Sequence, residues 1–449
     1  MDSVAERLAR GLIAAARAPL PPEVDREAKR TLFNVLGLAI GAAGHDGVDA
    51  IVAAARELGA EPDVAIPGRP ERTDALSAAL ATGFAAHVDD FDDTHLFTVI
   101  HPGAACLGVL AGLAAATAPS GARALAAFAV GCEAQLRAGV AISPEHYDRG
   151  WHITGTCGAI GAAVTAALLL EADEAMLTRA LRLATTMTLG HREGFGTMTK
   201  AFHPGKAASN GILAALAARR GLDGPRDAFE AADGWGAALS TRFDPAQLLD
   251  GIGERWELLQ NTYKPYPCGI VAHPSIDAAL ALAPRAGGPG AIASIAVRCH
   301  PLVSELMGNP DPQDGLEARF SAIHGVAAAL CDGVVGLAQY ETERVRRDDV
   351  RAVRAKTALH PDPAVNRDEA TIELRRADGT ALTEHVAHAR GSLARPLTDA
   401  ELGDKVRLLV EPRLGSAAVA PLTDAVRRIG ELPLAALFAL AAPPEHVRA

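Results

Sequence analysis

The segment Ala104–Ala116, AACLGVLAGLAAA, decides the fold class of this chain. It contains only apolar and small residues, and alanine and leucine are among the strongest helix formers. A helix that is apolar on every side must be buried, and small side chains let neighbouring helices approach closely. The segment therefore predicts a helix in the interior of a helical assembly.

Comparable segments fill most of the chain up to about residue 260. Each carries apolar residues at helical spacing or throughout. They are Asp25–Ile40, Asp74–His87, Ala122–Ile142, Thr156–Leu170, Glu174–Gly190 and Ala207–Arg220. Aromatic residues make up only 4% of the chain, so we expect a mainly α fold with a core of Ala, Leu, Val and Gly.

The pattern changes after about residue 265. Ala291–Val297 has the pattern of a short strand. Two further runs, Thr371–Leu374 and Glu384–Ala389, flank an Asp-Gly pair, which is a hairpin signal. Gly315–Cys331 and Thr398–Val410 are helical again.

We therefore predict two domains. A large all-helical domain comprises residues 1–264 and is completed by residues 396–449, and a smaller α+β lid domain comprises residues 265–395. A cleft between two domains is a common place for a binding site.

Composition limits the partners and the compartment. The net charge of −11 argues against nucleic acid as the main partner. The longest apolar run, Gly103–Ala116, is too short to span a bilayer, and the N-terminal segment with Asp2, Glu6 and Arg17 is a poor signal peptide. The six cysteines lack metal-ligand spacing. We expect a cytoplasmic protein without membrane contact or a metal centre.

The first unusual motif is HVDDFDDTH, residues 87–95, followed by His101. Its four carboxylates repel one another, so they need hydrogen-bond donors, a cation or solvent. One interpretation is a solvated acidic loop that caps the helix from Ala104. The other is an active-site loop in which Asp90 and Thr94 bind or orient and His101 is an acid/base group.

A second motif is GWHITGTCG, residues 150–158. A histidine in a Gly/Thr loop before an apolar helix can meet an anion at the helix N-terminus. His152 is the candidate. The alternative is a capping loop in which backbone groups satisfy this histidine.

A third motif is GFGTMTKAFHPGKAASNG, residues 194–211, which we interpret as a loop that precedes a packed helix. Lys200 could bind a carboxylate, or act as a base if burial and nearby cations lower its pKa. His203 is its neighbour. The alternative is an ordinary surface lysine.

The fourth motif is TYKPYPCG, residues 262–269, at the point where the composition changes. Its two prolines stiffen a strand-like link between the predicted domains. Lys264 would then face the cleft. The alternative is a rigid linker with an incidental lysine.

Together these motifs resemble the MmgE/PrpD family, which includes 2-methylcitrate dehydratases, cis-aconitate decarboxylases and iminodisuccinate epimerase. The matching pieces occur in family order and cover nearly the whole chain: AHVDDFDDTH, HPGA, GWHITGTCGAIGAA, GTMTKAFHPGKAASNG, KPYPCG, ARFSAIHGVAAAL and GSLARPLTDAELGDK. The resemblance implies a helical domain, an α+β lid, a homodimer, a small di- or tricarboxylate substrate, and no metal or organic cofactor.

The resemblance also implies a set of pocket residues. They are Asp90, Thr94, His101, His152, Lys200, His203 and Lys264. His324 stands where cis-aconitate decarboxylases have a tyrosine, and we assign it to substrate binding. Gly269 stands where those enzymes have a histidine. These two departures disfavour decarboxylation of cis-aconitate.

The expected function is a lyase that removes a proton next to a carboxylate and eliminates water, as a 2-methylcitrate dehydratase does. Lys200 and His101 would transfer the protons, with the base not assigned. His152, His203 and Lys264 would bind carboxylates, and Asp90 would orient a histidine.

Several alternatives remain at this stage. An epimerase would need the same acid and base, and a decarboxylase is less favoured. The run Asp89–Asp93 also fits the DDxxD motif of magnesium-dependent isoprenoid synthases, in which carboxylates on a helix hold Mg²⁺. A non-catalytic scaffold that binds carboxylates is the last alternative.

Overall fold

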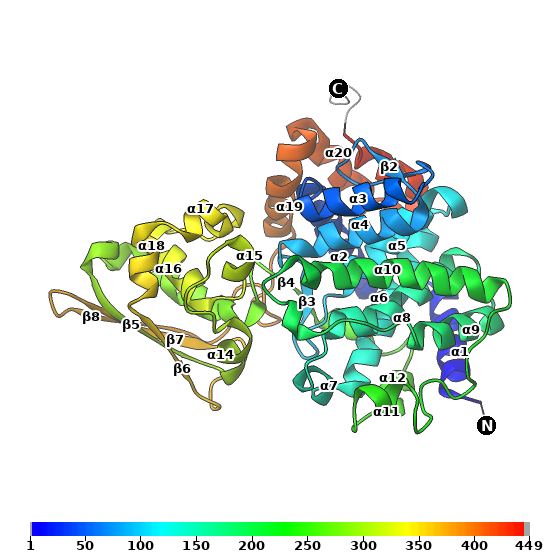
Figure 1. The fold of residues 1–449 in the computed structure, drawn as a ribbon, viewed down its shortest axis with the longest axis horizontal. Coiled ribbons are helices and arrows are strands. Elements are labelled where there is room, and N and C mark those ends of the chain that lie inside the picture. Colours follow the sequence, from blue (N-terminus) through cyan, green and yellow to red (C-terminus); the bar gives the residue numbers. More distant parts are fainter. Residues whose placement is uncertain (1, 444–449) are drawn as a thin grey trace.

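The computed structural model describes residues 2–443 and shows the predicted mainly α fold (Figure 1). Most helices form one large helical body. A smaller unit that contains a β-sheet lies beside it, and the last helices of the chain return to the body.

The helical body contains fifteen of the described helices. They are α1 (Val4–Arg17), α2 (Pro22–Gly41), α3 (Asp46–Glu57), α4 (Ala75–Val88), α5 (Pro102–Thr117), α6 (Gly121–Ile142), α7 (Glu145–Asp148), α8 (Ile153–Leu169), α9 (Glu174–Thr185), α10 (Met198–Arg219), α11 (Trp235–Leu239), α12 (Pro245–Leu249), α19 (Asp399–Leu414), α20 (Ser416–Arg427) and α21 (Leu434–Leu440).

One large cluster of buried apolar side chains holds the body together, drawn from residues 4–258 and 406–441. Glycines let α10 pack closely against its neighbours. A Cβ on Gly205 would lie 2.4 Å from the carbonyl oxygen of Leu80 in α4. A Cβ on Gly211 would lie 2.4 Å from the carbonyl carbon of Ala162 in α8. The small-residue composition is therefore what permits this helix spacing.

The smaller unit is built on a four-stranded sheet in the order β6-β5-β7-β8. Its elements are α13 (His273–Leu282), β5 (Ile292–Cys299), α14 (Pro301–Met307), α15 (Gly315–Ala318), α16 (Ala322–Asp332), α17 (Thr342–Val345), α18 (Asp348–Arg354), β6 (Thr357–Pro361), β7 (Ala370–Arg376) and β8 (Ala381–Val386). Strands β5 and β6 are parallel, and the other pairs are antiparallel. The predicted hairpin is confirmed as β7–β8, with Gly379 at a φ of 89° in the turn.

A second apolar cluster, drawn from residues 266–386, fills the smaller unit. The division of the chain into two domains with the limits given above stays a prediction, and so does the role of the smaller unit as a lid.

Two short strand pairs interrupt the helical body, which is therefore not all-helical as predicted. One joins β1 (Val64–Ala65) to β2 (Arg72–Thr73). The other joins β3 (Asp93–His95) to β4 (Asn261–Tyr263) and so brings the acidic motif beside the link that carries Lys264.

The third motif differs from the prediction, because Lys200 and His203 lie on a helix and not on a loop. Helix α10 begins at Met198, where the Thr197 hydroxyl caps it by accepting from the Thr199 amide at 3.2 Å. It then continues through Pro204, whose ring removes one backbone donor without ending the helix.

Two other predicted helices have different limits. Helix α9 ends at Thr185 and not at residue 190, where Gly190 has a φ of 112°. The predicted helix Gly315–Cys331 is divided into α15 and α16.

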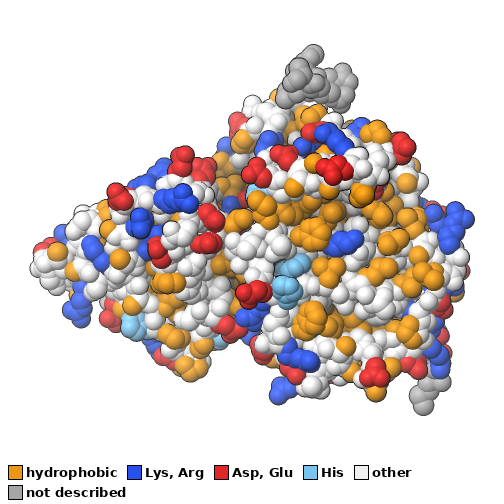
Figure 2. Space-filling model, in the orientation of Figure 1, with side chains coloured by type: hydrophobic (Ala, Val, Ile, Leu, Met, Phe, Trp, Pro, Cys, Tyr) orange, Lys and Arg blue, Asp and Glu red, His pale blue; other side chains and the backbone are white. Residues whose placement is uncertain are grey.

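Within the described residues, α6 and the bent pair α2–α3 are long and apolar enough to cross a membrane by composition. The apolar window of α6 is 89% buried inside the protein, as expected for a core helix. Figure 2 shows many hydrophobic side chains on the face of the body in view, whereas charged side chains are frequent over the smaller unit.

Candidate functional site

A small cavity lies where the body meets the smaller unit. Its lining contains six of the eight predicted site residues together with apolar side chains. The lining residues are Asp90, Thr94, Val99, His101, Tyr147, His152, Phe195, Lys200, Lys264, Gly269, Ile270, Val271, Leu306, Met307 and Phe320.

Three long helices begin at this cavity. His101 is the N-cap of α5, His152 is the N-cap of α8, and Lys200 lies in the first turn of α10. The N-terminus of a helix carries a partial positive charge and free backbone N–H groups. Their convergence makes the cavity suited to an anion such as a carboxylate.

Two lysines and one aspartate form the charged part of the cavity. The Asp90 carboxylate bridges the ammonium groups of Lys200 and Lys264, the second at 3.1 Å. Lys264 also donates to the Asp90 carbonyl oxygen at 2.9 Å. Lys264 is 1% exposed and Lys200 is 6% exposed, and lysines are rarely buried to this extent unless they are paired.

Aromatic rings shield Lys200 from solvent. Its Nζ lies 5.5 Å from the ring centroid of Phe195 and 5.2 Å from that of Phe320. Burial lowers the pKa of Lys200 below its usual value of 10.5, against the opposing effect of Asp90. Burial acts to raise the pKa of Asp90, but the two ammonium groups outweigh it and lower that pKa.

Each carboxylate of the acidic motif has its own partners, so the loop is not solvated as one interpretation expected, although Asp93 does cap α5 through the Gly103 amide. All these partners are hydrogen-bond donors of the protein, and they offset the repulsion among the four carboxylates. Asp89 binds Arg319 at 2.8 Å, Asp90 binds the two lysines, Asp92 contacts two histidines, and Asp93 accepts from the Gly103 amide at 3.1 Å and from Asn261 at 3.0 Å.

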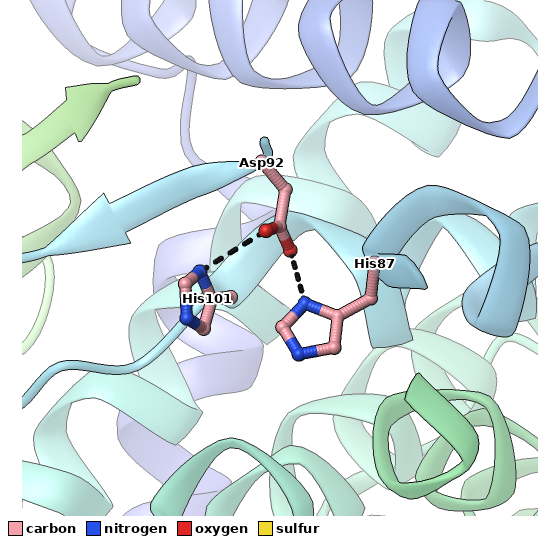
Figure 3. A group of neighbouring side chains, drawn as sticks. All are labelled: His87, Asp92 and His101. Atoms are coloured by element: carbon pink, nitrogen blue, oxygen red, sulfur yellow. Dashed lines mark hydrogen bonds and ion pairs between the residues drawn. The ribbon is translucent and has the colours of Figure 1, made fainter. Parts of the chain in front are cut away.

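Asp92 lies between two histidine rings, as Figure 3 shows. Its Oδ2 is 2.7 Å from Nδ1 of His87, and its Oδ1 is 3.2 Å from Nδ1 of His101. Asp90, which we expected to orient a histidine, makes its contacts with lysines. The orienting aspartate is therefore Asp92.

The tautomer of His101 follows from its other contacts. Nδ1 lies 2.9 Å from the carbonyl oxygen of Asp93, which can only accept a hydrogen bond. Nδ1 therefore carries the hydrogen, and Nε2 keeps a free lone pair when the ring is neutral. Burial, reinforced by Lys264 and Lys200, lowers the pKa of His101 against the opposing charge of Asp92. A pKa below 6.5 leaves the ring mostly neutral at pH 7.

His152 and His203 form a second pair, with their Nδ1 atoms 2.8 Å apart. Burial and the Lys200 ammonium hold the pKa of His152 well below 6.5, and burial lowers the pKa of His203 to about 4. One of these Nδ1 atoms donates a hydrogen bond, and the other accepts it. His203 does not line the cavity but contacts His152, which does, and its role in substrate binding stays a prediction.

The backbone of the lining is strained at two positions. Asp90 has a φ of 48° and Val99 a φ of 55°, in the left-handed region. A branched residue such as valine rarely adopts this region, and such strain costs about 1–3 kcal/mol. Strain of this kind is concentrated at functional sites.

The magnesium alternative does not fit this geometry. Asp89 caps the end of α4 and Asp93 begins β3, so the carboxylates do not share a helix face. The described side chains that could hold a metal ion by geometry are His87, Asp92 and His101, whose ligand atoms lie within 4.8 Å of one another. Within the described residues, Nε2 of His87 and Oδ1 of Asp92 are buried without a hydrogen-bond partner, and Nδ1 of His101 lies 2.9 Å from the Asp93 carbonyl oxygen.

The structure places His324 away from the predicted residues that line the cavity. It lies in the smaller unit, where Nε2 donates to the Gln339 carbonyl at 2.9 Å and the ring packs against Tyr340. It does not line the cavity. The family motif ARFSAIHGVAAAL gives the position of His324 in the chain but does not show where its side chain points. In this structure the ring is buried in the core of the smaller unit.

Sequence reasoning missed several other residues. His87 and Lys405 lie within the motifs that carry the family resemblance, so the signal was present. Lys405 donates to the carbonyl oxygens of Phe91 at 2.6 Å and Lys264 at 3.0 Å, which ties α19 to the site. Burial lowers the pKa of Lys405 to about 7. Of the apolar lining from the smaller unit, Ile270, Val271, Leu306 and Met307 lie outside the motifs quoted above.

Two family models together match most of the chain. The MmgE/PrpD N-terminal domain matches residues 6–248, and the MmgE/PrpD C-terminal domain matches residues 266–429.

Three curated relatives are cis-aconitate decarboxylases. The protein of Mus musculus is 28% identical over 96% of this chain and 92% of its own length. That of Homo sapiens is 30% identical over 86% of this chain and 82% of its own length. That of Aspergillus terreus is 22% identical over 81% of this chain and 80% of its own length. This chain therefore belongs to the MmgE/PrpD family.

Proposed function

We propose that this protein is a lyase that removes a proton from the carbon next to a carboxylate of a small di- or tricarboxylate and eliminates water. The observation that carries the proposal is the pair of a neutral His101 and a charged Lys200 on one cavity that suits an anion. The family and its decarboxylase relatives, which are lyases, support an enzyme of this general kind.

The first step is the binding of a substrate carboxylate by the ammonium groups of Lys200 and Lys264 and by the helix N-termini. A carbon acid next to a carboxylate is weak, because its conjugate base is an enediolate dianion. Fixed positive groups in a site shielded from water stabilise that charge as it develops. His101 and His152 are neutral, so they add hydrogen bonds to the substrate without adding a further charge to the site.

The second step is proton removal by His101. Its Nε2 has a free lone pair, and Nδ1–H is held by the Asp93 carbonyl. A positioned general base contributes about 10²–10⁴ in rate. As the C–H bond breaks, its electron pair moves toward the carboxylate carbon and then forms the new double bond.

The third step is the departure of hydroxide as water. Lys200 donates a proton to the leaving hydroxyl. The elimination therefore adds one proton to His101 and removes one proton from Lys200. Both groups return to their starting states by exchange with solvent. Elimination needs an acid and a base at once, as inversion by an epimerase does, and Lys200 and His101 can supply both.

Decarboxylation is the second candidate, since the named activity of the curated relatives favours it. It would break a C–C bond to release CO₂ and would need a group that protonates the resulting carbanion. The departure at Gly269, which lines the cavity, still counts against cis-aconitate as the substrate.

The cavity measures about 40 Å³, whereas a buried water needs about 10–15 Å³ by the same kind of measure. A di- or tricarboxylate is larger than a few waters. We therefore expect the smaller unit to move away from the body when substrate enters, which is the lid role expected from the family resemblance.

The test is incubation of the protein with malate, citramalate, citrate, isocitrate, 2-methylcitrate and cis-aconitate in D₂O, followed by NMR. An alkene formed with loss of water supports the proposal. Release of CO₂ would support the decarboxylase instead, and inversion without loss of a group would support an epimerase. Binding without deuterium uptake or product would leave only the non-catalytic scaffold.

A further inference from the structure

The two ends of the cavity differ in character. The body supplies its charged and polar side chains, including Asp90, Lys200 and Lys264. The smaller unit supplies Gly269, Ile270, Val271, Leu306, Met307 and Phe320. None of these six side chains has a charge or a hydrogen-bond donor. The cavity is therefore cationic on one side and apolar on the other.

Basic groups next to this apolar wall in sequence have partners elsewhere. The Arg319 guanidinium binds the Asp89 carboxylate at 2.8 Å and the Pro267 carbonyl at 3.0 Å. His273 donates to the Cys268 carbonyl at 3.2 Å, and burial lowers its pKa to about 3. In the described part of the chain, no charged side chain of the smaller unit lines the cavity.

The contact between Gly269 and Met307 makes this wall apolar. A Cβ built on Gly269 would lie 2.2 Å from the sulfur of Met307, so the thioether fills the space that a side chain at 269 would need. Met307 is itself 1% exposed and packs in the core of the smaller unit. Both residues line the cavity, and neither has a hydrogen-bond donor in its side chain.

We infer that the substrate carries its carboxylates at the lysine end and a hydrocarbon group at the Gly269–Met307 end. A carboxylate against that wall would lose its water without gaining a donor, which is costly. A hydrocarbon group there gains from burial. The substrate class is thus an alkyl-substituted hydroxydicarboxylate and not a tricarboxylate. This inference rests on the proposed function and narrows its substrate.

Two matched pairs of compounds test the inference. Citrate is malate with a carboxymethyl group on carbon 2, and 2-isobutylmalate has a hydrocarbon of nearly the same shape there. Isocitrate and 3-isobutylmalate form the same pair at carbon 3. We expect the alkyl member to bind at least about tenfold more tightly by calorimetry and to have a higher kcat/KM, since apolar pockets discriminate by about 10–200-fold for a single methylene.

Binding tests the inferred substrate class, and turnover tests the proposed function. Equal or tighter binding of citrate or isocitrate overturns the inference whatever the turnover. Tighter binding of the alkyl member without deuterium uptake or water loss supports the inference and overturns the proposed function. Failure of all four compounds to bind overturns both.

A variant pair sharpens the test. Met307→Lys places an ammonium at the apolar end and is expected to reverse the preference toward the tricarboxylate member. Met307→Leu keeps the wall apolar and should keep the wild-type preference. An unchanged preference in a folded Met307→Lys protein would count against the inference. If that variant does not fold, the wild-type comparison of matched pairs decides the matter.

Discussion

Replacement of Asp92 by asparagine should move the acid limb of the pH–rate profile to lower pH. Oδ1 of Asp92 lies 3.2 Å from Nδ1 of His101, and both side chains are buried. The negative charge favours the imidazolium form of His101 and so raises its pKa. Its removal lowers that pKa further and makes His101 a weaker base. The substitution preserves the shape of the side chain.

The size of the effect follows from this distance. Two unit charges at 3.2 Å interact by about 5 kcal/mol at an effective dielectric constant of about 20, which is an upper limit. Hydrogen bonds to charged groups contribute about 1.5–3 kcal/mol net. That range corresponds to a fall of about 1–2 pKa units. The Asp93 carbonyl, which the substitution leaves in place, keeps the same tautomer, so we expect a loss of about tenfold in kcat/KM at pH 7.

The assay is kcat/KM against pH on the substrate found by NMR, with Asp93→Asn as the matched control. Asp93 is the adjacent buried aspartate, and its carboxylate binds the Gly103 amide and Asn261 instead of His101. Burial and the charge of Asp92 raise its pKa to about 7, so asparagine resembles its protonated form. An unmoved acid limb in Asp92→Asn, or an equal shift in both variants, would refute the reasoning.

The remaining predictions concern pH, metal, His324 and assembly. The kcat/KM profile should be bell-shaped, because His101 becomes protonated as pH falls through a pKa below 6.5 and Lys200 loses its proton as pH rises through a pKa below 10.5. Dialysis against EDTA should leave turnover unchanged; a loss restored by added metal would show that the group in Figure 3 holds an ion. His324→Ala should lower the free energy of unfolding by about 1–3 kcal/mol, measured with urea, and leave KM unchanged, because its bond to a buried carbonyl lies outside the cavity. We propose that the chain forms a homodimer that buries the apolar face of α10, where Phe202 is 39% and Leu213 is 45% exposed, so Phe202→Asp should halve the mass found by light scattering; a monomeric wild type would exclude the homodimer, and a variant that stays dimeric would exclude that face.

Local sequence patterns predicted the helical core and the hairpin well. Ala104–Ala116 lies inside α5, whose residues are buried from Pro102 to Ala114. The Asp-Gly turn lies between β7 and β8. Both signals depend only on residues that are close in the chain. For the helix the signal is an unbroken apolar run, and for the hairpin it is a turn residue that tolerates a positive φ. The charge argument on the acidic motif also held, since each aspartate required a donor and has one.

Long-range contacts produced the differences. The pairing of β3 with β4 joins residues 93–95 to residues 261–263, and no local pattern shows it. The sequence pattern predicted a helix from Ala207, but the Thr197 cap and close packing on α4 and α8 begin the helix at Met198 and carry it across Pro204. The direction of a side chain, inward for His324 and toward His101 for Asp92, likewise depends on neighbours that are distant in sequence.

The most direct test of the account is the rate at which substrate takes up deuterium from D₂O in the His101→Gln variant. Glutamine can occupy the space of the ring but cannot accept the proton. We predict that exchange at the carbon next to the carboxylate falls at least about a hundredfold relative to the wild type, while substrate binding by calorimetry remains. Exchange at a near wild-type rate in a folded His101→Gln protein would contradict the central claim that His101 is the base.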